Sequence, residues 1–126
     1  AMFREYFKPR VAKVCDLIHE RCPGLKILLH SCGSVAPLIP EFIDAGIDAL
    51  NPVQITADNM DPAVLKREFG GHIAFWGGGI GTQTTLCHGT PDEVREAFRT
   101  GRDRLRELVD DIVAGRLVPR PVRLGG

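Results

Sequence analysis

The sequence predicts an α/β fold, in which three parallel strands alternate with helices. Three short apolar runs, each bounded by turn residues, have the composition of strands buried on both faces; they cover residues 26–30, 47–51 and 72–76. Each run is followed by a segment with the three- and four-residue apolar spacing of a helix. Since strands that alternate with helices form parallel sheets, we expect one helix and then three strand–helix units.

The first two helices are predicted from their spacing and from their end signals. The first covers residues 2–22, has Pro9 in its first regular turn and ends at a Cys-Pro-Gly turn. The second follows the first strand, with Ser34 as its N-cap and Gly46 at its C-terminal end. Two prolines in its first turn leave the start of this second helix open.

The last two helices carry clearer signals. One begins with Asp61 as its cap and Pro62 at the first helical position, and a glycine pair closes it. The longest begins at Thr90, which has the spacing of a capping box with Glu93. Gly101 interrupts this helix at a cost of about 1 kcal/mol relative to alanine.

Composition places the chain among ordinary globular proteins. It has 126 residues, with 16 basic and 16 acidic side chains, so its net charge gives no reason to expect nucleic acid or an anionic membrane as a partner. No apolar run approaches the roughly 18 residues of a membrane span, and no secretion leader is seen. The four cysteines form no CxxC pair and are expected to be free thiols or ligands in a cytoplasmic protein. We expect residues 1–115 to form one domain and residues 116–126 an extended or disordered tail.

Unusual residues gather where the predicted strands end. The carboxyl ends of parallel strands meet at one edge of a sheet, where the following loops form sites. The opposite strand ends carry ordinary turns. The candidates at this edge are His30 and Cys32 after the first strand, Asn51 and Gln54 after the second, and Trp76 and Gly78 after the third.

Four motifs carry a resemblance to a known family. They are Leu-His-Ser-Cys-Gly-Ser, Asp-Ala-Leu-Asn-Pro-Val-Gln, Phe-Trp-Gly-Gly-Gly-Ile and His-Gly-Thr-Pro-Asp-Glu-Val, in that order. Over residues 2–100 the chain resembles the C-terminal part of the uroporphyrinogen decarboxylase (URO-D) superfamily. The resemblance implies a partial (β/α)8 TIM barrel, since a closed barrel needs eight strands in roughly 250 residues. The family includes the decarboxylase of haem synthesis and cobalamin-dependent methyltransferases.

The two branches imply different cofactors. The decarboxylase uses neither metal nor cofactor, whereas the methyltransferases hold Zn²⁺ through a His-x-Cys motif and a later cysteine, with a corrinoid as methyl donor. His30 and Cys32 match the His-x-Cys motif, and side chains at i and i+2 of an extended segment point the same way. The third ligand is expected after Val113, where this chain has an Arg/Pro segment instead. Cys87 or His88 could replace it.

Three function hypotheses follow. The first is a fragment related to tetrapyrrole decarboxylation, and the second is zinc-dependent transfer of a methyl group from a corrinoid to a thiol. The third is a non-catalytic fragment that pairs with a missing N-terminal barrel half or with itself, because a half-barrel exposes apolar surface. In both branches the resemblance implies that some catalytic or metal-binding residues lie outside residues 2–100. We therefore expect the chain alone to be inactive.

Each candidate residue also has a structural interpretation. His30 and Cys32 are explained somewhat more simply by packing at a strand end than by zinc or thiol chemistry. Asn51 and Gln54 are either ligands of a polar substrate or caps of their own loops. Trp76 is more simply a packing residue than a platform for a ligand, and the glycines around Gly78 allow a close backbone approach but form no dinucleotide fingerprint.

Overall fold

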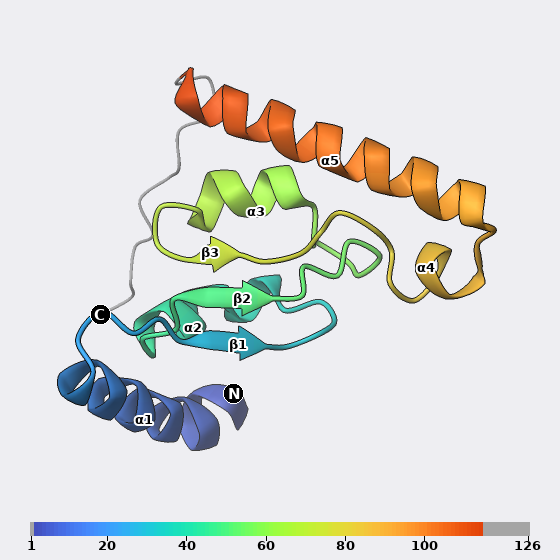
Figure 1. Cartoon of the computed structure of the whole chain (residues 1–126). Coiled ribbons are helices and arrows are strands. Elements are labelled where there is room, and N and C mark those ends of the chain that lie inside the picture. The colour runs from blue at the N-terminus through green and yellow to red at the C-terminus, as the bar shows by residue number, and fades with distance from the viewer. Residues whose placement is uncertain (1, 115–126) are drawn as a thin grey trace.

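One parallel sheet organises the chain. The computed structural model describes residues 2–114, apart from the side chains of Leu108 and Ile112. Its strands are β1 (Leu28–His30), β2 (Ala49–Asn51) and β3 (Ala74–Phe75), in the order β1-β2-β3. All three run in the same direction, as the parallel arrows in Figure 1 show. The predicted α/β class is confirmed, and the arrangement is that of part of a (β/α)8 barrel.

The helices follow the predicted order. The π-helical turn η1 (Phe3–Phe7) leads into α1 (Lys8–Arg21), and the 3₁₀ turn η2 (Ala36–Leu38) leads into α2 (Ile39–Asp44); α3 (Pro62–Phe69), α4 (Thr85–His88) and α5 (Pro91–Val113) follow. The helix α4 was not predicted, because this four-residue helix has no side-chain cap. The predicted tail, residues 116–126, lies outside the described residues.

Several predicted helix ends are confirmed by hydrogen bonds. Asp61 Oδ1 accepts from the backbone amides of Ala63 and Val64, at 2.9 and 3.0 Å, and so caps α3. At the start of α5, the Thr90 amide donates to Glu93 Oε2 at 2.7 Å and the Glu93 amide to Thr90 Oγ1 at 3.3 Å. These two bonds are the reciprocal pair of a capping box.

Two expectations were wrong. Ser34 does not cap the second helix, because its hydroxyl donates to the Asp58 carbonyl at 2.6 Å and so joins the first strand-end loop to the second. The strands are also shorter than the predicted runs. Before β3, the amides of His72 and Ile73 still donate to the Phe69 carbonyl, so the end of α3 occupies the start of the third run.

The sheet has one buried face and one exposed face. Leu50, at the centre of β2, is 0% exposed and packs with the buried core, which includes Ile39 and Phe42 of α2 and Leu65 of α3. On β1 the register partner of Leu50 is Leu29, and Leu28 is the residue before it. Leu28 is 46% exposed. Successive side chains of a strand point to opposite faces. The helices therefore cover the Leu50 face and leave the Leu28 face open.

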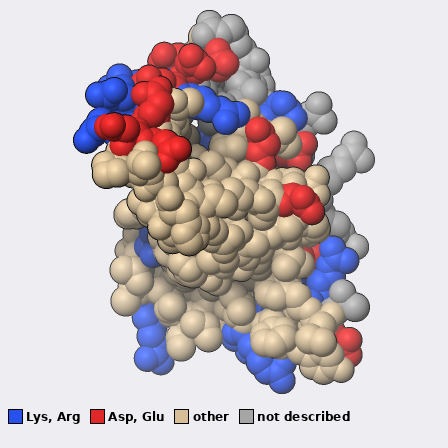
Figure 2. Space-filling model, turned by 90° about the vertical axis from the view of Figure 1, so that its right-hand side faces the viewer, with Lys and Arg blue, Asp and Glu red and all other residues tan. Residues whose placement is uncertain are grey.

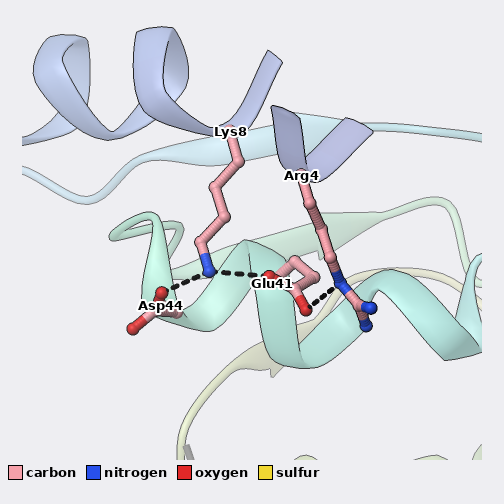
Figure 3. A network of polar contacts seen from close by, with 4 residues as sticks. All are labelled: Arg4, Lys8, Glu41 and Asp44. Carbon is pink, nitrogen blue, oxygen red and sulfur yellow. Dashed lines mark hydrogen bonds and ion pairs between the residues drawn. The ribbon is translucent and has the colours of Figure 1, made fainter. Parts of the chain in front are cut away.

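A cluster of charged side chains joins the first helices to α2. Arg4 Nε and Lys8 Nζ each lie 2.6 Å from a different oxygen of Glu41, and Lys8 also pairs with Asp44 (Figure 3). The hydrogen bond from Lys8, together with that from Arg4, holds the pKa of Glu41 below its usual range. Hydrogen bonds to Asp44 and Glu41 raise the pKa of Lys8. Both shifts favour the charged forms, so the cluster fixes α1 beside α2 at neutral pH.

Asp48 is the centre of a second cluster of charged side chains, at the amino end of the sheet. Its carboxylate accepts from the Ile27 amide at 3.0 Å and lies 2.8 Å from Lys26 Nζ and 3.0 Å from His19 Nε2. Burial alone would raise its pKa, but the bonds from Lys26, Ile27 and His19 outweigh burial and lower the pKa from 3.8 to about 2. The ionised form of Asp48 therefore stabilises the fold.

This pKa predicts a loss of stability in acid. Because the folded pKa lies below the unfolded one, the contribution of Asp48 is complete above about pH 4 and is lost as the pH falls toward 2. We expect the difference in free energy of unfolding between wild type and Asp48→Asn to shrink by about 2 kcal/mol between pH 5 and pH 2. Urea unfolding of both proteins at each pH measures it. A difference that does not change with pH would contradict the assigned pKa.

Candidate functional site

The candidate site lies where the three strands end. Figure 2 views the molecule from the side toward which the strands point, and its centre is a broad surface without charged side chains, with charges over α5 and at the lower edge. The loops that follow the strands explain this, because residues 31–35, 52–60 and 76–90 contain a single Asp, Glu, Lys or Arg, which is Asp58. This edge therefore offers neutral hydrogen-bonding groups, imidazoles and thiols.

His30, Cys32 and Asn51 come together at this edge. His30 is the register partner of Asn51 on the neighbouring strand, so both side chains project on the same face of the sheet. His30 Nδ1 lies 2.7 Å from Asn51 Oδ1, and His30 Nε2 lies 3.6 Å from Cys32 Sγ. His30 and Cys32 are both exposed. The structure therefore groups a ring nitrogen, a thiol and an amide at an accessible position.

Gln54 connects all three strand-end loops. Its Oε1 accepts from the Gly33 amide at 2.8 Å, and its Nε2 donates to Gln83 Oε1 at 2.8 Å. Both ends of the Gln54 amide bond to protein groups, as loop capping requires. A contact of Gln54 with a polar substrate stays a prediction.

Trp76 takes part through its backbone. Its carbonyl accepts from Asn51 Nδ2 at 3.1 Å, while its side chain is 67% exposed. The Trp76 side chain is therefore not part of the buried core of residues 2–114. The contact of the Trp76 ring with a ligand stays a prediction.

Gly78 lies on the segment that follows β3. It lines a cavity of about 440 Å³ between the loop after β3, the start of α3 and one face of α5. Its φ is +86°, and a Cβ there would lie 3.3 Å from Val53 Cβ, so glycine permits the close approach of this loop to the loop after β2. Of the predicted substrate-binding residues, Asn51 thus contacts His30, Gln54 and the Trp76 carbonyl take part in hydrogen bonds among the strand-end segments, and Gly78 lines the cavity.

The candidate third ligands are not grouped with His30 and Cys32. The thiol of Cys87 donates to the Thr82 carbonyl at 2.9 Å, beside α4, and His88 ends the same short helix. In the described part of the chain, no three His, Cys, Asp or Glu side chains are arranged to hold a metal ion. The structure therefore brings together two of the predicted metal ligands, and the contribution of Cys87 stays a prediction.

The His30 and Cys32 atoms have the separation that a tetrahedral zinc site requires. With a Zn–N distance of about 2.0–2.1 Å and a Zn–S distance of about 2.3 Å, a tetrahedral angle places the two ligand atoms about 3.6 Å apart. The observed separation is 3.6 Å. Imidazole and thiolate are also the ligand types that suit zinc. The pair fits one nitrogen and one sulfur position of such a site.

Comparisons with known proteins give one match. A protein-family model described as uroporphyrinogen decarboxylase (URO-D) matches residues 1–109, most of the chain. Searches of curated proteins and of solved structures found no match. In residues 2–114, no helix is both long and apolar enough to cross a membrane.

Proposed function

The chain belongs to the uroporphyrinogen decarboxylase family, and from this premise we propose that it serves the zinc-dependent methyl-transfer chemistry of that family. In this proposal His30 and Cys32 hold part of a zinc site, and the acceptor of the methyl group is a thiol. The observation that carries the proposal is the separation of 3.6 Å between His30 Nε2 and Cys32 Sγ. It fits a shared tetrahedral zinc ion without rearrangement.

Each residue of the pair has a defined role. His30 supplies a neutral nitrogen ligand, and Cys32 supplies a sulfur ligand that loses its proton on binding the metal. When bound, zinc would lower the pKa of a substrate thiol and so supply a thiolate at neutral pH. Because both ligands are exposed at the strand ends, such a thiol can reach the site from solvent.

The remaining ligand positions lie beyond this pair. A catalytic zinc site has three protein ligands and one open position. Residues 2–114 group two ligands, and residues 115–126 contain no His, Cys, Asp or Glu. The third ligand is therefore Cys87 or His88, after a rearrangement of their segment, or a residue of a second copy of the chain. The open position is the one that the substrate thiol takes.

Decarboxylation of a tetrapyrrole is the second candidate, and the description of the matching family model favours it. The carboxylates of such a substrate need cationic partners. The strand-end loops carry no Lys or Arg, so those partners would have to lie elsewhere. The groups at this edge suit metal and thiol chemistry better, which places decarboxylation second.

Metal binding tests the proposal. We expect the purified chain to bind about one Zn²⁺ or Co²⁺ ion, with a thiolate-to-cobalt absorption band, and to lose it in both His30→Ala and Cys32→Ala. Cys22→Ala is the matched control, since Cys22 is also an exposed thiol but lies at the end of α1. The same titration of Cys87→Ala shows whether Cys87 is a third ligand.

Two results would count against the proposal. A wild type that binds no metal, or metal binding that survives in both His30→Ala and Cys32→Ala, would remove its basis. If such a metal-free chain shifted the absorption of an added porphyrin bearing acetate side chains, the decarboxylase candidate would take its place.

A further inference from the structure

We infer that Asn51 is a positioning residue, which holds His30 in the tautomer with its proton on Nδ1 and thereby leaves Nε2 free beside Cys32. The purpose of this arrangement rests on the proposed function. The tautomer itself follows from hydrogen bonds and can be tested without a metal. Neither the family match nor the sequence motifs assign this role to Asn51.

The orientation of the Asn51 amide is the first step. Its Nδ2 lies 3.1 Å from the Trp76 carbonyl oxygen, and its Oδ1 lies 2.7 Å from His30 Nδ1. Exchanging the nitrogen and the oxygen would place two oxygens without a proton against each other at Trp76. An amide side chain has donors only on nitrogen and an acceptor only on oxygen. The backbone carbonyl of Trp76 therefore turns the Asn51 oxygen toward His30.

The tautomer of His30 follows from this orientation. Asn51 Oδ1 can only accept, so His30 Nδ1 must be the donor in the 2.7 Å bond. In a neutral imidazole the other nitrogen then carries a lone pair. That nitrogen is Nε2, which lies 3.6 Å from Cys32 Sγ. With the opposite tautomer, a proton on Nε2 would occupy the position that a metal ion needs.

The backbone keeps this arrangement rigid. The Ser31 amide donates to the Asn51 carbonyl at 2.7 Å, and the Trp76 amide donates to the Leu50 carbonyl at 2.9 Å. The ends of β1, β2 and β3 are thus fixed around the Asn51 side chain. A histidine that binds a metal commonly donates its other ring N–H to such a fixed acceptor, which sets its tautomer and ring orientation. Here an amide oxygen takes this place.

Nitrogen-15 NMR of histidine-labelled protein without metal, at a pH where the ring is neutral, tests the tautomer. The His30 signals among the four histidines are identified by their absence in His30→Gln. We expect the Nδ1–H form in the wild type. We expect Asn51→Leu, which has no acceptor, to move toward the Nε2–H form that a histidine side chain in water prefers, and to bind zinc about 10–100-fold more weakly.

Gln54→Leu is the matched control. It removes another amide from the same loop, with bonds to Gly33 and Gln83, but none to His30. We expect it to leave the His30 tautomer unchanged. Trp76→Leu should do the same, because the Trp76 carbonyl and not its indole contacts Asn51.

The outcomes separate this inference from the proposed function. An Nε2–H form in the wild type would overturn the inference whether or not the leucine variant folds, and so would an Nδ1–H form that persists in a folded Asn51→Leu. A wild type with the Nδ1–H form but without metal binding would sustain the inference and overturn the proposed function.

Discussion

Replacing Leu50 by alanine is expected to lower the free energy of unfolding by about 2–5 kcal/mol. Leu50 is 0% exposed and lies at the centre of the middle strand, in the buried cluster that also holds Ile39, Phe42 and Leu65. Truncation removes the transfer free energy of the buried side chain and leaves a cavity that helices on the sheet cannot fully close. Urea unfolding followed by circular dichroism measures the loss.

Leu28→Ala is the matched control for this experiment. The residue type and the substitution are the same, but Leu28 lies on the other face of the sheet and is 46% exposed. We expect its cost to be roughly 1 kcal/mol or less, because only part of its apolar area is removed from water. Equal losses in the two variants would contradict an open face, and would show that another copy or another chain covers Leu28 in solution.

The elements could be predicted where their signals are local. The Asp61 cap, the capping box of Thr90 with Glu93, and the alternation of strands and helices are encoded by neighbouring residues, and the structure confirms them. The wrong expectations depend on contacts between distant segments. Ser34 has the composition of a cap, but the Asp58 carbonyl competes for its hydroxyl, and no local pattern states that.

The candidate site divides in the same way. The spacing of His30 and Cys32 within one extended segment predicted that both side chains point the same way, and the structure places them 3.6 Å apart. The partners of Asn51 depend on the register of β1 and β2 and on the position of Trp76 beyond β3. A sequence alone does not specify that register. The residue types at the site were therefore predictable, whereas the direction of each hydrogen bond was not.

Gly101 shows how the structure can reverse a local argument. By helix propensity, Gly101→Ala should stabilise α5 by about 1 kcal/mol. A Cβ at this position would lie 1.8 Å from the Gly79 carbonyl oxygen, far inside van der Waals contact. The long helix α5 approaches the loop after β3 so closely here that a methyl group does not fit. The glycine that interrupts the helical pattern is what allows α5 to pack on this loop.

We therefore expect Gly101→Ala to lower the free energy of unfolding by about 1–3 kcal/mol, since overpacking a close contact outweighs the gain in helix propensity. Thr100→Ala is the control: Thr100 is the exposed neighbour of Gly101 on α5, and alanine there raises helix propensity without entering the contact with Gly79. Thermal unfolding should place Gly101→Ala below the wild type and Thr100→Ala at or slightly above it. If Gly101→Ala were instead more stable than the wild type, α5 would not lie against the Gly79 carbonyl in solution. The residues of α5 would then not line the 440 Å³ cavity beside Gly78.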